Sequence, residues 1–260
     1  MYVEAGYSMK SASGKAAATP EKPTAKAFEA RLMALQSDDE LRKIQRYFKS
    51  EEGDYGAGDR FIGVRMGSLF KLAEEFLDMP VKEIERLLES DIHEMRAGAC
   101  SIMGKAAAEK GATEERRKEL FDLYLRRHDR INNWDLVDLA AWHVIGPWLV
   151  EKPRDVLYRL AKSKNLWERR TAILATFAFI KRGQVEDTLK ISELLLKDPE
   201  DLIHKAAGGM LRAVGDKHPD AHRAFLDKHA AGMPRVMLRY AIEKLPAKDR
   251  EHYLTPGKGR

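Results

Sequence analysis

A recurring helix with a small residue at its centre constrains the fold of this 260-residue chain more than any other feature. Each instance has an alanine in the middle of an apolar helical pattern. The residue three positions earlier is polar or charged, except for the leucine of the last instance. The pairs are Arg96/Ala99, Asp138/Ala141, Arg169/Ala172, His204/Ala207 and Leu238/Ala241. Their spacing of roughly 31 to 42 residues lies within or near the range of two-helix HEAT-like repeats. The pattern predicts helix pairs stacked into a solenoid.

The rest of the chain also favours helices. Helical patterns of about 10 to 18 residues, separated by short breaks, continue to Leu254, and no convincing period-two strand interrupts them. A glycine-rich loop at 51–58 separates two N-terminal helices from the later ones. We therefore predict an all-α fold, an α-solenoid of roughly six HEAT-like repeats with a concave basic groove. A compact helical bundle is the alternative, although it would not need the near-regular spacing.

Composition sets the domain boundaries and the expected surroundings. Residues 1–24 are small and polar, so we expect a disordered tail, followed by a single repeat domain over 25–260. Lys and Arg outnumber Asp and Glu by 46 to 41, which favours polyanionic partners. Cys100 is the single cysteine, which fits a reducing cytoplasm, and no apolar run approaches the ~20 residues that span a bilayer. We expect a cytoplasmic monomer.

Most familiar catalytic motifs are absent. The chain has no Gly-x-Ser-x-Gly, no phosphate-binding loop ending in Gly-Lys-Ser/Thr and no His-Glu-x-x-His. His218 and His222 have the spacing of metal ligands, but Pro219 lies between them and no third ligand is evident. We expect neither a metal nor a cofactor.

One stretch, residues 131–142, brings together an aromatic ring and a carboxylate. Asn132 or Asn133 can cap a helix, after which Trp134 and Asp138, four residues apart, share one face. Asp138 lies at the edge of an apolar stripe, where a groove would run. Simpler explanations remain open, because the helix dipole favours an early Asp and a Trp beside an apolar stripe usually packs in a core.

Basic residues recur near the starts of the following helices. Arg170, Lys205 and Arg235 hold comparable positions in successive repeats, so they could line one concave surface together with Asp138. Helix N-termini with nearby Lys or Arg are suited to phosphate. The alternative is that Asp138 and Arg170 only form an ion pair between neighbouring repeats.

Five sequence blocks resemble the DNA alkylation repair enzymes of the AlkD type, in order and from about residue 26 to 254. They are Arg46-Tyr47-Phe48-Lys49, Phe61-Ile62-Gly63-Val64-Arg65, Asn133-Trp134-Asp135-Leu136-Val137-Asp138, Leu166-Trp167-Glu168-Arg169-Arg170-Thr171-Ala172-Ile173-Leu174 and Lys205-Ala206-Ala207-Gly208-Gly209-Met210-Leu211-Arg212. The resemblance implies a HEAT-like solenoid that binds double-stranded DNA. It also implies a monofunctional glycosylase that removes cationic bases such as N3-methyladenine and N7-methylguanine.

The resemblance also implies roles for particular residues. Asp138 matches the catalytic carboxylate, Trp134 an aromatic that lies against the lesion nucleotide, and Tyr47 a further aromatic of the cleft. Arg170 matches the arginine that holds backbone phosphate. The further predicted DNA contacts are Arg169, Lys205, Arg212 and Arg235.

The implied chemistry suits these residue types. A cationic base is already a good leaving group, so a carboxylate that stabilises an oxocarbenium-like sugar can suffice without a general acid. Aromatic faces attract a positive base more than a neutral one. At one position the chain departs from the family, which commonly has a second cleft Trp where this chain has Gly209, so we expect weak excision. A non-catalytic DNA-binding relative and a protein-interaction scaffold are the alternative functions.

Overall fold

The computed structural model describes residues 23–48 and 58–255, apart from the side chain of Tyr47. Helices account for most of the described chain, and the β-structure in it is one isolated bridge between Arg60 and Ile92. The elements are α1 (Ala25–Met33), α2 (Asp38–Tyr47), α3 (Met66–Glu74), α4 (Val81–Leu88), α5 (His93–Ala108), α6 (Glu114–Arg126), η1 (His128–Arg130), α7 (Trp134–Ala140), α8 (Ile145–Leu149), α9 (Asp155–Ala161), α10 (Leu166–Ala175), α11 (Phe177–Ile180), α12 (Glu186–Leu194), α13 (Asp201–Lys217), α14 (Pro219–His229), η2 (Ala230–Gly232), α15 (Arg235–Ala241) and α16 (Ala247–Leu254).

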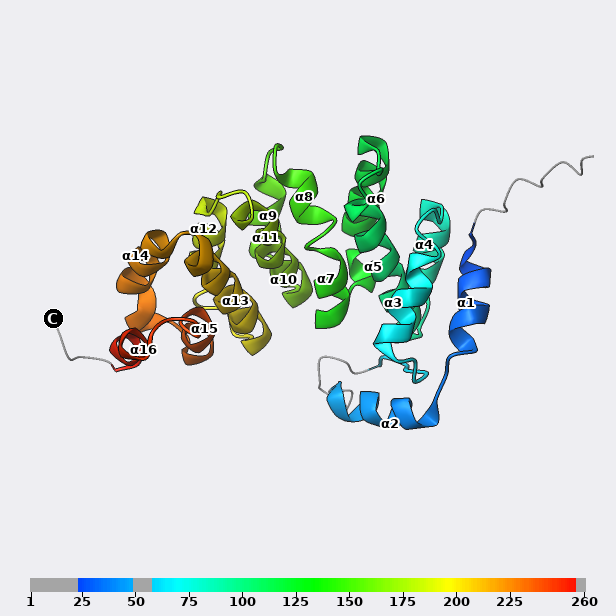
Figure 1. Cartoon of the computed structure of the whole chain (residues 1–260), viewed down its shortest axis with the longest axis horizontal. Helices are drawn as coiled ribbons and strands as arrows, with labels where there is room; N and C mark the ends of the chain where they lie inside the picture. The colour runs from blue at the N-terminus through cyan, green and yellow to red at the C-terminus, as the bar shows by residue number, and fades with distance from the viewer. Residues whose placement is uncertain (1–22, 49–57, 256–260) are drawn as a thin grey trace, which may run out of the picture.

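The helices are arranged as an arc, with α1 and α16 at its opposite ends (Figure 1). Helices α6, α8 and α12 lie along the outer side, and α7, α10, α13 and α15 follow one another along the inner side. The predicted all-α solenoid is therefore confirmed. Because each helix contacts mainly its neighbours in such an array, equivalent positions of successive inner helices line the same concave surface.

The small residues that defined the repeat lie where the inner helices pack. Ala99, Ala141, Ala172, Ala207 and Ala241 are all buried. Glycine permits even closer approach: a Cβ at Gly208 of α13 would lie 2.5 Å from the carbonyl oxygen of Met237 in α15. Small side chains at these positions let neighbouring helix backbones approach, which explains why the repeat is visible in the sequence.

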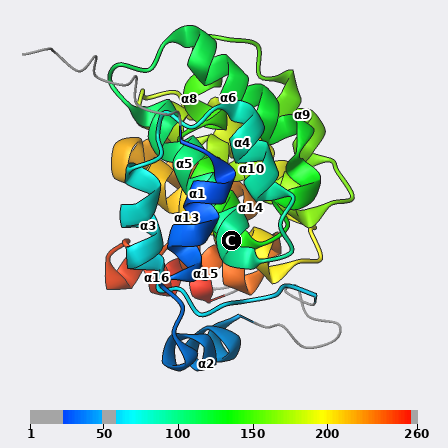
Figure 2. The same cartoon turned by 90° about the vertical axis from the view of Figure 1, so that its right-hand side faces the viewer.

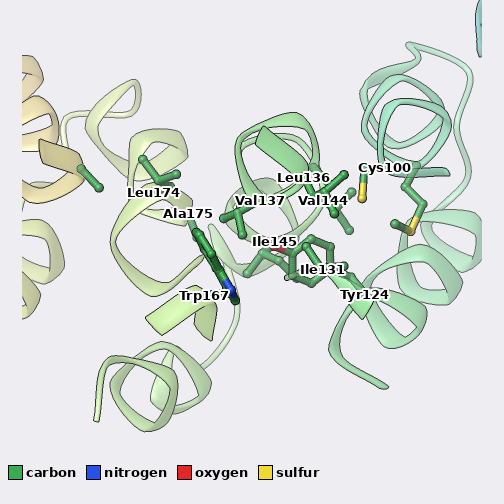
Figure 3. Close-up of a cluster of buried hydrophobic side chains, with 14 of the residues drawn as sticks. Cys100, Tyr124, Ile131, Leu136, Val137, Val144, Ile145, Trp167, Leu174 and Ala175 are labelled. Carbon is green, nitrogen blue, oxygen red and sulfur yellow. The ribbon is translucent and has the colours of Figure 1, made fainter. Parts of the chain in front are cut away.

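One hydrophobic core runs the length of the array. Figure 3 shows its central part, where Trp167 of α10 lies in the same buried cluster as Tyr124, Ile131 and Ile145. Trp167 is only 7% exposed, so this tryptophan of the family-like block serves packing and not the concave surface. No helix in the described ranges is long and apolar enough to cross a membrane.

Helix α2 stands apart from the stacked helices, along the lower edge of the molecule (Figure 2). It begins as the sequence indicates, because the side chain of Ser37 accepts a hydrogen bond from the backbone N–H of Glu40. Residues 49–57, which contain most of the predicted glycine-rich loop, lie outside the described residues. Nearly all of the predicted tail, residues 1–22, also lies outside them.

Two predicted helices are divided in the structure. The apolar stripe beside Asp138, which continues as far as Trp148, belongs to α7 and α8, with a turn over 141–144 between them. The helical pattern around Ala172 is split at Thr176 into α10 and α11. The hydroxyl of Thr176 donates to the carbonyl of Ile173, a bond that competes with helical pairing of the backbone. The buried face is nevertheless continuous across the α7–α8 turn.

Candidate active site and nucleic-acid groove

Helix α7 begins at the candidate site, and Asn133 fixes its first turn. The Asn133 side-chain oxygen accepts from the backbone N–H of Trp134 at 2.8 Å, and its amide nitrogen donates to the Asp59 carboxylate at 3.0 Å. The sequence left open whether Asn132 or Asn133 caps this helix, and the structure shows that Asn133 does. Trp134 and Asp138 follow at helical spacing and are both partly buried on the same side of α7.

Trp134 and Asp138 border a concavity of about 410 Å³ between the inner helices, which we call the Asp138 groove. Helix α10 provides its floor, α7 and α13 lie on either side, and α15 contributes one residue. Its lining consists of Trp134, Asp138, Trp142, Arg170, Leu174, Leu202, Lys205, Ala206, Gly209, Met210, Arg212 and Tyr240. The structure therefore brings a carboxylate, aromatic rings and basic side chains from successive repeats into one groove.

Asp138 and Arg170 form a bidentate ion pair inside this groove. Nε and Nη2 of Arg170 each donate to one carboxylate oxygen at 2.8 Å, and Nη1 donates to the carbonyl of Leu202 at 2.8 Å. The ion pair that the sequence left as an alternative is therefore present. A guanidinium has five N–H donors, and the described residues engage three of those of Arg170. The other two can donate to a further oxygen ligand.

Burial affects the Asp138 carboxyl more strongly than its partner does. Its side chain is 31% exposed at the rim of the groove, whereas the Arg170 side chain is 9% exposed. Burial raises the pKa of Asp138 above its ordinary value, although the hydrogen bonds and charge of Arg170 act in the opposite direction. A carboxylate held in this way is a stronger base than one in water, and its charge is less screened.

A second cavity lies on the other side of Trp134 and Asp138, between α2 and the inner helices. It has a volume of about 610 Å³ and a mostly apolar lining, made of Glu40, Lys43, Ile44, Phe48, Arg65, Met66, Phe70, Trp134, Asp135, Asp138 and Leu139. Phe48 stacks on Trp134 with ring centroids 5.6 Å apart and the planes at 17°. Trp134 and Asp138 thus stand on the ridge between two concavities, and Phe48 supports the indole from the α2 side.

A buried charged cluster beneath this ridge was missed by the sequence analysis. Nε2 of His93 lies 2.7 Å from Asp135, and its Nδ1 lies 3.1 Å from Asp59, which also pairs with Arg96. Burial would lower the pKa of His93, but the hydrogen bonds and charges of Asp135 and Asp59 outweigh it and raise the pKa to about 9. His93 is therefore an imidazolium at neutral pH, and it ties the start of α5 to that of α7.

The chain segment before α3 is fixed by a single buried carboxylate. Glu94 accepts hydrogen bonds from the backbone N–H groups of Ile62, Gly63 and Val64, at distances between 2.9 and 3.3 Å. Gly63 has a φ of +79°, and a side chain there would strike the carbonyl of Ser37. This explains the glycine in the block that resembles the family.

The predicted DNA contacts fall into two groups. Lys205 and Arg212 border the Asp138 groove together with Arg170, and Arg212 also pairs with Glu243. Arg169 and Arg235 are not among the lining residues. Arg169 binds Asp198 at 2.6 Å together with two loop carbonyls, and Arg235 donates to the carbonyl of Leu254 at 3.0 Å.

The position of Arg169 has a simple cause. Neighbouring residues on a helix point about 100° apart, and Asp198 with two loop carbonyls holds the Arg169 guanidinium outside the groove lining. The contacts of Arg169 are structural, and a role for Arg169 or Arg235 at DNA stays a prediction. Tyr47 ends α2, and its side chain lies outside the described part of the structure.

Comparison with known proteins agrees with this geometry. The family model described as DNA alkylation repair enzyme matches residues 28–245. The chain therefore belongs to the DNA alkylation repair enzyme family. A solved structure described as a predicted DNA alkylation repair enzyme from Enterococcus faecalis superposes with a TM-score of 0.64 at 16% identity, covering 82% of this chain and 97% of that one. No curated protein matches the chain.

Membership of the family identifies this chain as a DNA repair protein with DNA as its substrate. The superposition supports the α-solenoid fold, and at 16% identity it supports the fold alone. Basic side chains such as those of the Asp138 groove are the ones that commonly bind DNA phosphates in protein–DNA complexes.

Proposed function

We propose that the chain is a monofunctional DNA glycosylase that removes cationic alkylated purines, such as N3-methyladenine and N7-methylguanine, from double-stranded DNA. One observation carries the proposal: Asp138 and Trp134 border the same groove as Arg170 and Lys205. This groove offers an aromatic face for a cationic base, an anion for a developing sugar cation and positive charge for the flanking phosphates.

The chemistry requires little from the protein because the alkylated base already carries a positive charge. The bond between C1′ and the base nitrogen breaks with its electron pair going to the base, which leaves as a neutral molecule. The sugar acquires oxocarbenium character, and the Asp138 carboxylate stabilises that charge. Water then adds to C1′ and gives up a proton, for which a carboxylate with a raised pKa is a suitable acceptor.

The ion pair with Arg170 is compatible with this role. A DNA phosphate entering the groove can bind the two N–H donors of Arg170 that the described residues leave unengaged. The more the guanidinium turns to the phosphate, the less it neutralises Asp138. Binding of DNA would then increase the effective negative charge opposite C1′.

The first prediction tests the carboxylate. Asp138→Asn keeps the shape but removes the charge, so release of N7-methylguanine from a methylated duplex should fall by on the order of tenfold to a thousandfold. Affinity for the duplex should persist. The matched control is Asp198→Asn, because Asp198 forms a comparable ion pair with Arg169 away from the groove. If the two variants lose stability alike and neither lowers release, Asp138 is only a structural partner of Arg170.

The second prediction concerns phosphate. Affinity for duplex DNA should decline steeply with salt, at about 0.9 power of salt concentration for each phosphate neutralised. Lys205→Ala and Arg170→Ala should each lower this slope by about one, whereas Lys118→Ala, on the outer helix α6 and paired with Asp122, should leave it unchanged. An affinity independent of ionic strength would be incompatible with binding through this groove.

Gly209 favours a second candidate, a family member that binds distorted or branched DNA without excising a base. The wall of the groove has no side chain at this position. Such a protein would show the salt dependence and would release no base. A protein-interaction scaffold would show neither property, and the basic residues of the groove argue against it.

A further inference from the structure

Trp142 borders the Asp138 groove but has no part in the mechanism described so far. It lies in the turn between α7 and α8, four residues after Asp138, which itself lies four residues after Trp134. At a helical rise of 1.5 Å per residue, Trp134 and Asp138 are about 6 Å apart along the axis of α7, and Trp142 follows in the turn after the helix. All three side chains border the groove, so Asp138 has one tryptophan before it and one after it along this wall.

The Trp142 ring is supported from one side and is not fixed by a hydrogen bond. It packs on Phe177 with ring centroids 4.7 Å apart and the planes at 53°, and the Lys181 ammonium lies 4.6 Å from the centroid of Phe177. The indole N–H of Trp142 is buried and has no hydrogen-bond partner among the described residues. An unpaired buried donor is unfavourable, so the ring gains if it turns toward a ligand or water.

Open space lies across the groove from this wall. Gly209 of α13 also borders the groove, and a Cβ built there meets nothing within 4 Å. Gly208 beside it is tightly packed against α15, so the opening is particular to position 209. The floor beneath is the apolar side chain of Leu174. The groove can therefore admit a flat ring on the Trp142 side of Asp138.

We propose that Trp142 is a specificity-determining residue that offers an aromatic face to the cationic base in the space opened by Gly209. The inference rests on the proposed function, because it presupposes a positively charged base beside Asp138. An aromatic face attracts a cation through its quadrupole and attracts a neutral base much less. Trp142 thereby favours alkylated over undamaged purines, and it removes the reason to expect weak excision from a chain with Gly209.

The test compares binding of two duplexes that resist hydrolysis. Each has one central 2′-fluoro-2′-deoxyguanosine, which is methylated at N7 and therefore cationic in one duplex and unmodified in the other. In the wild type the cationic duplex should bind more tightly. Trp142→Leu should reduce this preference by about two- to thirtyfold, and Trp142→Phe should retain most of it. Trp148→Leu is the control, because Trp148 packs on Phe121 outside the groove.

A swap sharpens the test. Gly209→Trp in the Trp142→Leu background should restore preference for the cationic duplex, because the new indole enters the same space from the opposite wall. Thermal unfolding identifies variants that fail to fold. If Trp142→Leu fails to fold, Trp142→Met takes its place in the comparison. A wild-type preference in every folded variant without the aromatic ring would overturn the inference.

Release of N7-methylguanine, measured in parallel, separates this inference from the proposed function. If the wild type and Trp142→Leu both release the base and prefer the cationic duplex equally, the role of Trp142 is overturned. The proposed glycosylase activity is then supported. A preference that depends on Trp142 without any release supports Trp142 and overturns catalysis. Neither release nor preference in the wild type overturns both.

Discussion

The charge of His93 should make the stability of this protein depend on pH in a specific direction. His93 is 1% exposed, and Asp135 and Asp59 contact its two ring nitrogens. Its pKa rises from an ordinary value of 6.5 to about 9 in the folded chain. Since one pKa unit corresponds to 1.36 kcal/mol, the protonated ring contributes on the order of 3 kcal/mol to the free energy of unfolding.

The sign follows from the raised pKa. The contribution is complete below pH 6.5, where the ring is protonated in both states, and it is lost as the pH rises from 6.5 through about 9. His93→Gln keeps a hydrogen-bonding side chain without the charge. The free energy of unfolding of the wild type should therefore fall between pH 6.5 and 9 by about 3 kcal/mol more than that of the variant.

Urea denaturation at several pH values between 6 and 9.5 measures this difference. His222→Gln is the control: burial lowers the pKa of His222, so its protonation should affect stability only below pH 6.5. Parallel curves for the wild type and His93→Gln across the window would refute the reasoning. They would mean that the ring between the two carboxylates is neutral in the folded protein.

Two further predictions concern stability. Glu94→Ala deprives the backbone N–H groups of Ile62, Gly63 and Val64 of their acceptor, so the free energy of unfolding measured in urea should fall by about 3 kcal/mol or more; a loss below about 1 kcal/mol would show that water replaces the carboxylate. Gly146→Ala places a Cβ against the Ala175 carbonyl oxygen and should lower Tm, whereas Gly209→Ala meets open space and should stabilise helix α13 by about 1 kcal/mol; similar shifts in both variants would contradict the packing.

Helical periodicity made the solenoid predictable. The buried alanines recur because each repeat meets the same packing requirement: Ala99, Ala172 and Ala207 lie inside α5, α10 and α13, whereas Ala141 follows α7 and Ala241 ends α15. The four-residue spacing of Trp134 and Asp138 predicted that they share one helix face. The place of Arg170 in the next repeat predicted that it lies in the same groove. Because these relations are either local in the chain or repeated along it, they can be predicted from one sequence without an alignment.

The remaining features depend on contacts between distant segments. Asp59, His93 and Asp135 meet from three separate segments, and nothing near any one of them in the sequence indicates the other two. Asp198 is another distant partner that the sequence does not indicate. It lies 29 residues after Arg169 and binds the guanidinium outside the groove. The turn that ends α7 before Trp142 was hidden because the apolar stripe continues across it.

The Asp138–Arg170 ion pair has a consequence for how DNA first approaches the protein. An acid at the centre of a concave surface would repel a polyanion at long range, whereas a bidentate pair presents almost no net charge until the two molecules touch. Arg212 also has an acidic partner, Glu243, through a single contact, which leaves Lys205 as the basic residue of the lining without an ion pair among the described residues. Under the proposed function, the repulsion between carboxylate and phosphate would be postponed until the duplex is seated, when the local field of Asp138 at the sugar would help to break the glycosidic bond.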